Sequence, residues 1–255
     1  MPEKTLRITY VGHATMLVEL DGVKILTDPV LRKRVAHLHR LSPMVQSPLN
    51  GLGKPDGILV SHLHVDHFDV RSLRKFDPGV AILVPLGGAV QFLHRFGFTD
   101  VRGVEAGADA SFGPVEVRAV HAQHSVVPGA SRIVGPALGY VLEGSASVYF
   151  AGDTDVYAEM SELSGTDVAL LPVAGWGPRL PEGEHMNPLR AAEALKLLKP
   201  RIAIPIHWGT FAPLWARSGY PENEAAPEQF RQHAAKIAPE VEVRVLRPGE
   251  TFTLE

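Results

Sequence analysis

Histidine and aspartate side chains of the kind that bind metals are concentrated in one short segment, residues 61–69. It contains His62, His64, Asp66 and His67 in the spacing H-x-H-x-D-H. In an extended chain, residues two apart face the same side, so His62 and His64 are expected to point to one position. Asp66 and His67 follow a predicted turn and can face a second position nearby. Imidazole and carboxylate groups are ligands for zinc, iron and manganese, so this spacing predicts a metal site rather than a solvated turn.

Residues of the same kind recur after later predicted strands. Taken singly, each has an ordinary explanation, because a carboxylate after a turn can cap a helix and an isolated histidine is commonly a core or surface residue. Their recurrence at successive strand ends favours one shared site. Spacing alone does not choose between the two histidines after the first of these strands. The residues are His121 or His124 after residues 115–120, Asp153 after 147–151, and His207 after 202–206.

The composition is that of an ordinary globular protein and narrows the function classes. With 255 residues, 45% of them hydrophobic and 21% charged, the chain can bury a substantial core. The formal net charge of -3 argues against a general nucleic-acid binder. There is no cysteine, which excludes disulfides and thiolate ligands. Neither a leader-like segment nor a stretch of ~20 apolar residues is present, so we expect a cytoplasmic protein without stable membrane insertion.

Hydrophobic periodicity predicts strands first, then helices, then both in alternation. This order suggests two sheets packed face to face with helices outside, in a single domain over residues 1–255. Strands are predicted over residues 6–11, 15–20, 23–27, 57–60, 81–85, 101–104, 115–120, 137–142, 147–151, 168–173, 202–206, 241–246 and 251–254. Helices are predicted over residues 70–76, 88–96, 156–163, 188–198 and 227–237.

A long irregular segment is predicted over residues 30–55. Loops of this length in a compact domain are usually functional or disordered. Although the protein is slightly acidic, this segment is basic, and the sequence leaves open whether it is a substrate lid or plain surface. Its basic and histidine side chains are Arg32, Lys33, Arg34, His37, His39 and Arg40.

The order of these motifs resembles that of the metallo-β-lactamase-fold hydrolases. Shorter motifs look like the branch that contains the N-acyl-phosphatidylethanolamine phospholipase D type enzymes and the L-ascorbate-6-phosphate lactonases. The resemblance extends from about residue 5 to residue 211. The shorter motifs are YVGHAT at 10–15, TDP at 27–29, AQH at 122–124, LPV at 171–173, HMNP at 185–188 and HWGT at 207–210.

The resemblance implies an α+β fold, the αββα sandwich of two mixed sheets packed face to face, with two divalent metal ions at one edge. It favours His124 over His121, because the family's ligand follows an Ala-Gln dipeptide. Asp153 would bridge the two ions. The first ion would be bound by His62, His64 and His124, and the second by Asp66, His67 and His207.

The resemblance also implies roles for residues around the ligands. His13 and Asp28 would orient the ligands, and His185 would face the substrate and protonate the leaving group. Arg34, in the basic segment, would meet an anionic group. Apart from the resemblance, Trp176 and Trp208 are candidates to wall the pocket, with a place in the core as the alternative. The phospholipase-like members have GAYEPR where residues 174–179 read AGWGPR. This departure disfavours membrane lipids as substrates.

Two cations about 3.5–4 Å apart can share a water, lower its pKa and so make hydroxide available as a nucleophile. Asp66 would orient that water or accept its proton. The expected function is therefore a dinuclear metal-dependent hydrolase, with zinc as the expected ion and manganese or iron as alternatives. Its substrate would be a small, anionic phosphodiester, ester or lactone. The other hypotheses are a catalytically silent metal-binding scaffold, a nuclease and an oxygen- or nitric-oxide-reducing di-iron protein. The oligomeric state is open.

Overall fold

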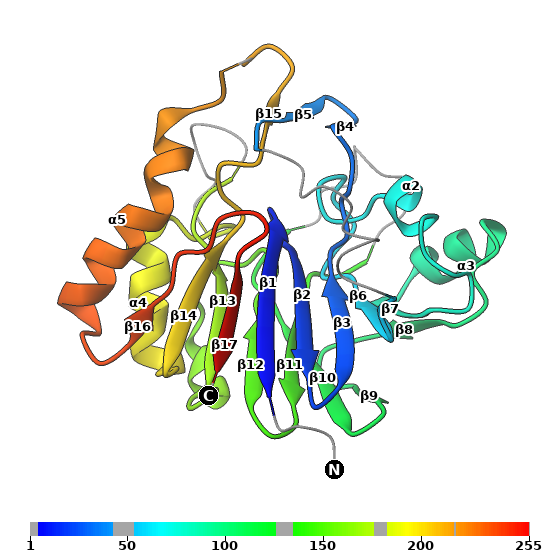
Figure 1. Ribbon diagram of the computed structural model, residues 1–255, viewed down its shortest axis with the longest axis horizontal. Coiled ribbons are helices and arrows are strands. Elements are labelled where there is room, and N and C mark those ends of the chain that lie inside the picture. The colour runs from blue at the N-terminus through cyan, green and yellow to red at the C-terminus, as the bar shows by residue number, and fades with distance from the viewer. Residues whose placement is uncertain (1–4, 43–53, 126–134, 176–182, 217, 255) are drawn as a thin grey trace.

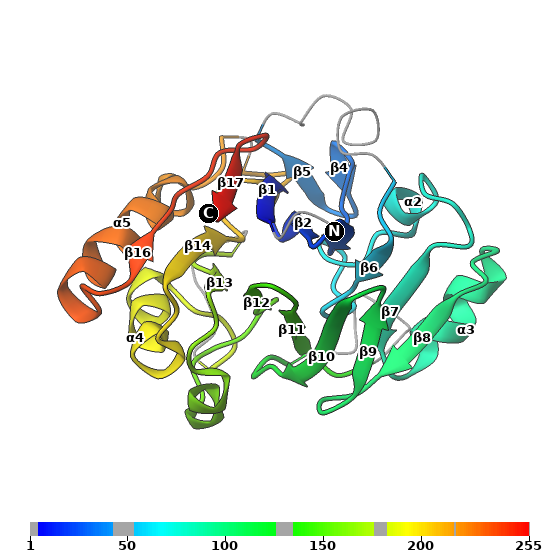
Figure 2. The same ribbon diagram turned by 60° about the horizontal axis from the view of Figure 1, so that its bottom comes forward.

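Two large β-sheets packed face to face form the centre of the computed structural model, which describes residues 5–42, 54–125, 135–175, 183–216 and 218–254. Helices α2 (Val70–Leu73) and α3 (Gly88–Arg95) lie outside one sheet. Helices α4 (Pro188–Leu198) and α5 (Pro221–Ile237) lie outside the other, as Figures 1 and 2 show. This arrangement confirms the predicted αββα sandwich.

The first sheet has seven strands and mixes both directions. In spatial order the strands are β17 (Thr251–Leu254), β1 (Leu6–Gly12), β2 (Thr15–Leu20), β3 (Val23–Thr27), β6 (Gly57–Leu59), β7 (Ala81–Pro85) and β8 (Val101–Val104). β1, β2 and β3 pair antiparallel, whereas β6, β7 and β8 run parallel to β3.

The second sheet also has seven strands. β12, β13 and β14 are parallel and fully or almost fully buried, because one face packs on the first sheet and the other lies under α4 and α5. In spatial order the strands are β16 (Glu242–Val243), β14 (Ile202–Ile206), β13 (Val168–Pro172), β12 (Ser147–Phe150), β11 (Leu138–Glu143), β10 (Val115–His121) and β9 (Asp109–Phe112).

A small third sheet lies at the top of the molecule in Figure 1. It joins β4 (Arg34–Val35), β5 (Leu38–Arg40) and β15 (Phe211–Pro213), all antiparallel. The sequence predicted only irregular chain over residues 30–55, which is wrong for β4 and β5. Strands of two or three residues are too short to produce a periodic pattern, so this sheet depends on tertiary contacts.

The main core lies between the two large sheets. Inward-facing side chains such as Ile8 and Ile25 from the first sheet pack with Tyr140 and Phe150 from the second, and all four are fully or almost fully buried. A second apolar layer lies beneath α4 and α5, and a third beneath α2 and α3. The in–out alternation of β10 from Val115 to Ala119 reflects an outer face that remains exposed there.

Most predicted elements are present with small shifts at their ends. Asn187 caps α4 by accepting hydrogen bonds from Leu189 and Arg190, as predicted. The helix predicted over 227–237 was wrong at its start, because α5 begins at Pro221 and tolerates Pro227 inside it. The helix predicted over 156–163 is instead the short 3₁₀ helix Ala158–Leu163. Only two residues of the predicted strand 241–246 form β16.

The strand directions determine where a site can form. Because β1, β3 and β6 all point the same way, their carboxyl ends meet at one edge of the first sheet. β10, β12 and β14 share a direction in the second sheet. His207 donates its backbone N–H to the carbonyl of His13 at 3.0 Å, which joins the two edges. In the described ranges, no helix is long and apolar enough to cross a membrane.

Candidate metal centre

Metal-ligating side chains from both sheets converge at this shared edge and form two adjoining clusters. The first cluster contains His62, His64, His124 and Asp153. Nε2 of His62 lies 3.0 Å from Nδ1 of His64, and Nε2 of His124 lies 3.1 Å from the same atom. His121, the competing histidine of β10, points elsewhere and packs against Tyr157. The structure therefore places His124, and not His121, with the other histidines.

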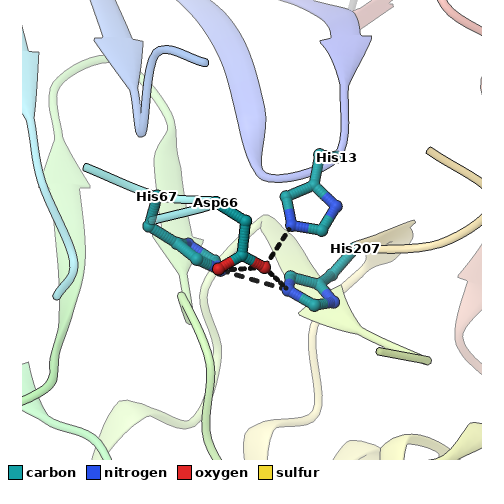
Figure 3. A group of neighbouring side chains, drawn as sticks. All are labelled: His13, Asp66, His67 and His207. Atoms are coloured by element: carbon teal, nitrogen blue, oxygen red, sulfur yellow. Dashed lines mark hydrogen bonds and ion pairs between the residues drawn. The ribbon is translucent and has the colours of Figure 1, made fainter. Parts of the chain in front are cut away.

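The second cluster contains His13, Asp66, His67 and His207, which Figure 3 shows pointing toward one another from three segments of the chain. Nε2 of His207 lies 3.1 Å from Nε2 of His67 and 3.5 Å from Oδ2 of Asp66. All four residues are almost completely buried. This donor set of nitrogen and carboxylate oxygen atoms matches the ligand types of zinc and related ions.

Asp153 lies against both clusters. Its carboxylate is 3.2 Å from Nε2 of His67, 3.3 Å from Nε2 of His207 and 3.8 Å from Nε2 of His62. It follows β12, and Gly152 before it has a positive φ of 62°. A single carboxylate in this position can contact two cations at once.

The ring nitrogens that face away from the clusters have hydrogen-bond acceptors. Nδ1 of His207 donates to the carbonyl of Ala174 at 2.7 Å, and Nδ1 of His124 donates to the carbonyl of Glu184 at 2.9 Å. A carbonyl oxygen can only accept, so Nδ1 of each ring carries a proton, and Nε2 is the nitrogen available to a metal ion in the cluster. Histidines that bind metals are commonly oriented in this way.

The facing lone pairs provide a test of whether these residues fit a metal. Nδ1 of His67 donates to Oδ2 of Asp28 at 2.7 Å, so its Nε2 faces Nε2 of His207 at 3.1 Å, a contact between two acceptors unless a proton or a metal ion lies between them. Oδ1 of Asp153 is buried and has no hydrogen-bond partner among the described residues. A divalent cation satisfies both features, and the donor set therefore fits one.

The electrostatics of the site also favour positive charge. Burial lowers the pKa of His67, but the carboxylates of Asp153, Asp66 and Asp28 outweigh it and raise that pKa well above its usual value. Burial raises the pKa of Asp66 and of Asp153, but neighbouring histidines hold both well below the usual range. Two ionised carboxylates in a buried pocket need cationic compensation, which bound metal ions can supply.

His13 differs from the other histidines of its cluster. Its Nε2 lies 3.0 Å from Oδ2 of Asp66, but its buried Nδ1 has no hydrogen-bond partner within the described part of the chain. Burial, with His207 nearby, lowers the pKa of His13 to about 3, so the ring is neutral. The geometry is that of an Nε2–H donor to Asp66. His13 has φ of 62° and His207 has φ of 60°, in the left-handed region that non-glycine residues adopt only uncommonly.

His185 lies beside both clusters, and its side chain is partly exposed. Its ring centroid is 4.6 Å from that of His124 and 6.0 Å from that of His207, and its Nδ1 is 3.6 Å from Oδ2 of Asp153. Burial is the largest influence on His185 and lowers its pKa to about 4. The ring is therefore neutral near pH 7.

Of the two residues expected to bind substrate, the structure describes only Arg34. Arg34 is exposed on β4 in the small sheet. Trp176 lies outside the described residues.

Two supporting groups escaped the sequence analysis. Ser61 immediately precedes the metal motif, and its hydroxyl contacts Asp28, His62 and His67. Asp155 accepts hydrogen bonds from the backbone of Gly183 at 3.1 Å and from Arg190 at 3.0 Å, which holds the segment of Glu184 and His185 against the site. The sequence offered one indication of a supporting role, the position of Ser61 next to the metal motif, and none for Asp155.

Comparisons with known proteins agree with this fold. The model of the β-lactamase superfamily domain matches residues 23–208. A UPF0173 metal-dependent hydrolase of Methanopyrus kandleri is 34% identical over 255 residues, covering 97% of this chain and 99% of the relative. One of Rubrobacter xylanophilus is 34% identical, with 96% and 95% covered. The solved structure of a metallo hydrolase from Ignicoccus hospitalis is 28% identical with a TM-score of 0.75, covering 98% of this chain and 99% of that one.

The fold, the two clusters and full-length similarity above 30% identity thus lead to one family. The chain belongs to the β-lactamase superfamily and, within it, to the UPF0173 metal-dependent hydrolases.

Proposed function

We propose that this protein is a hydrolase that uses two divalent metal ions to cleave a small phosphodiester, ester or lactone. The observation that carries the proposal is the position of Asp153, whose carboxylate lies within 3.8 Å of histidines from both clusters. A carboxylate so placed can join two ions in one reaction centre.

The proposed ligand sets divide the two clusters. Asp153 belongs to both, and zinc is the expected ion, with manganese or iron as alternatives. The first ion is assigned to His62, His64 and His124, and the second to Asp66, His67 and His207. Bound divalent cations supply a water of lowered pKa and polarise the substrate oxygen on which charge develops.

The remaining residues orient groups and handle protons. His13 donates to Oδ2 of Asp66, which leaves Oδ1 of that carboxylate to orient a water or accept its proton. His185 faces the centre with a neutral ring, so we propose that it hydrogen-bonds the substrate rather than carrying a proton to the leaving group. Arg34 and Trp176 remain candidates for contact with an anionic substrate.

The test is the metal content of purified protein followed by turnover assays after reconstitution. We expect two ions per chain and hydrolysis of bis(4-nitrophenyl) phosphate or of simple lactones. Turnover of only one of the two substrate types would choose between phosphodiesters and lactones. Two ions with no turnover of any ester would support a silent scaffold, and salt-dependent RNA cleavage would support a nuclease.

A further inference from the structure

Ser61 lies between ligands of the two clusters. Its hydroxyl oxygen is 2.6 Å from Oδ2 of Asp28, 3.0 Å from Nδ1 of His62 and 3.5 Å from Nδ1 of His67. The side chain is almost completely buried, so water does not replace these contacts. His62 belongs to the first cluster and His67 to the second.

The direction of each hydrogen bond follows from the chemistry of the groups. Asp28 accepts from the Ser61 hydroxyl, from the Ser61 backbone N–H at 2.7 Å and from Nδ1 of His67 at 2.7 Å. Ser61 therefore donates its single hydroxyl proton to Asp28. Its oxygen can then only accept from Nδ1 of His62, which leaves Nε2 of His62 free to face the first cluster.

The backbone around Ser61 is also tightly held. Its carbonyl accepts the N–H of Leu138 from the second sheet at 2.9 Å. A Cβ atom added to Gly152, which precedes the bridging Asp153, would lie 2.6 Å from the Cβ of Ser61. The hydroxyl thus has little freedom to move away from Asp28 and His62.

We infer that Ser61 and Asp28 form one hydrogen-bonded unit that sets the tautomer and orientation of a metal ligand in each cluster. Ser61 is a positioning residue in this account: it acts through His62 directly and through Asp28 on His67. The inference rests on the proposed two-metal function, because it concerns the residues that would hold both ions.

Ser61→Ala tests the inference, and Ser72→Ala is its matched control. Ser72 is equally buried, and its hydroxyl donates to Asp69 at 2.6 Å and accepts from the N–H of Leu31 at 2.7 Å, outside both clusters. Loss of either hydroxyl leaves a buried group unsatisfied, so both variants should lower the melting temperature. The two variants should differ in zinc binding only if the Ser61 hydroxyl orients metal ligands.

The measurement is the affinity for zinc at each cluster, from competition with a chromogenic chelator, with the two steps assigned by His124→Ala and His207→Ala. We expect Ser61→Ala to weaken zinc binding at the first cluster about 10–100-fold and at the second by a smaller factor, and Ser72→Ala to leave both unchanged. Unchanged affinities in Ser61→Ala overturn the inference. If Ser61→Ala weakens zinc binding at the first cluster alone, Ser61 does not act through Asp28 on His67, and the inference of one shared unit is wrong.

A spectroscopic signal separates this inference from the proposed function. In zinc-loaded wild-type protein labelled with ¹⁵N-histidine, Nδ1–H of His62 should give a slowly exchanging signal that is lost in Ser61→Ala and kept in Ser72→Ala. Persistence of that signal in Ser61→Ala overturns the inference. Fewer than two zinc ions in wild-type protein would instead contradict the dinuclear function, and the His62 signal would still decide the role of Ser61.

Discussion

Nε2 of His67 and Nε2 of His207 face one another at 3.1 Å, while the opposite nitrogen of each ring donates to a fixed acceptor. Two neutral imidazoles in this arrangement would repel through their lone pairs, and the surrounding carboxylates raise the pKa of His67 well above its usual value, so the contact favours a bound cation. The buried carboxylates of Asp66 and Asp153 add negative charge beside them. The fold therefore holds together a set of groups that a cation would stabilise.

Removal of metal should lower stability as well as activity. An ion at 100 times its Kd stabilises the folded state by about 2.7 kcal/mol, which is roughly 5–10 °C in Tm for a domain of this size. We expect a chelator to lower the Tm by this amount for each ion lost, and zinc to restore it. The check is thermal unfolding by circular dichroism, and a Tm that is the same with and without chelator would contradict the account.

The two histidines at the end of β10 make a matched pair. His124→Ala should remove the first ion and reduce turnover by about 10³-fold or more, since Lewis-acid stabilisation supplies several kcal/mol. His121→Ala, which alters an exposed ring packed on Tyr157, should keep both ions. Metal analysis of the two proteins decides the matter, and equal metal content in both would refute the assignment of His124.

His13 should affect rate more than metal content. Because its ring donates to Asp66 and its Nδ1 has no orienting acceptor among the described residues, we treat it as a group that orients a ligand. His13→Ala should lower kcat/KM about 10–100-fold and retain two ions per chain. If the variant instead binds one ion fewer, His13 is itself a ligand.

Replacing Asp155 should affect stability and metal binding, although Asp155 belongs to neither cluster. Its carboxylate holds Gly183 and Arg190, and the neighbouring carbonyl of Glu184 orients His124. We expect Asp155→Ala to destabilise the fold by about 1–3 kcal/mol and to weaken the first ion more than the second. Urea unfolding and chelator competition measure the two effects. Equal weakening of both ions would show that the segment does not act through His124.

Long elements of the fold could be predicted because each carries its own pattern. The strands 15–20, 23–27, 81–85 and 202–206 match their predicted bounds, since branched apolar residues bounded by turns indicate buried strands. The strands of the small sheet could not be predicted, because their few residues gain their hydrogen bonds only from distant segments. The start of α5 was missed because Pro227 resembles a first helical residue.

The sequence pattern also predicted which residues could bind metal, whereas it did not predict the residues that hold them in place. The spacing of residues 62–67 reflects local geometry, so the motif itself predicted that His62, His64, Asp66 and His67 lie near one another, as the structure shows. Asp28 and His13 were expected only through the family resemblance. Ser61 and Asp155 act through contacts across the two sheets and across the segment before α4, and nothing in their spacing indicates those contacts.

The most direct test of the two-metal centre is the zinc content of wild-type protein and of Asp153→Ala. Both proteins are saturated with zinc, desalted and analysed by inductively coupled plasma mass spectrometry, with circular dichroism confirming that each is folded. The account predicts two zinc ions per wild-type chain, and fewer than two with no detectable turnover in the folded variant. A single ion in wild-type protein, or two ions and full activity in Asp153→Ala, would contradict it.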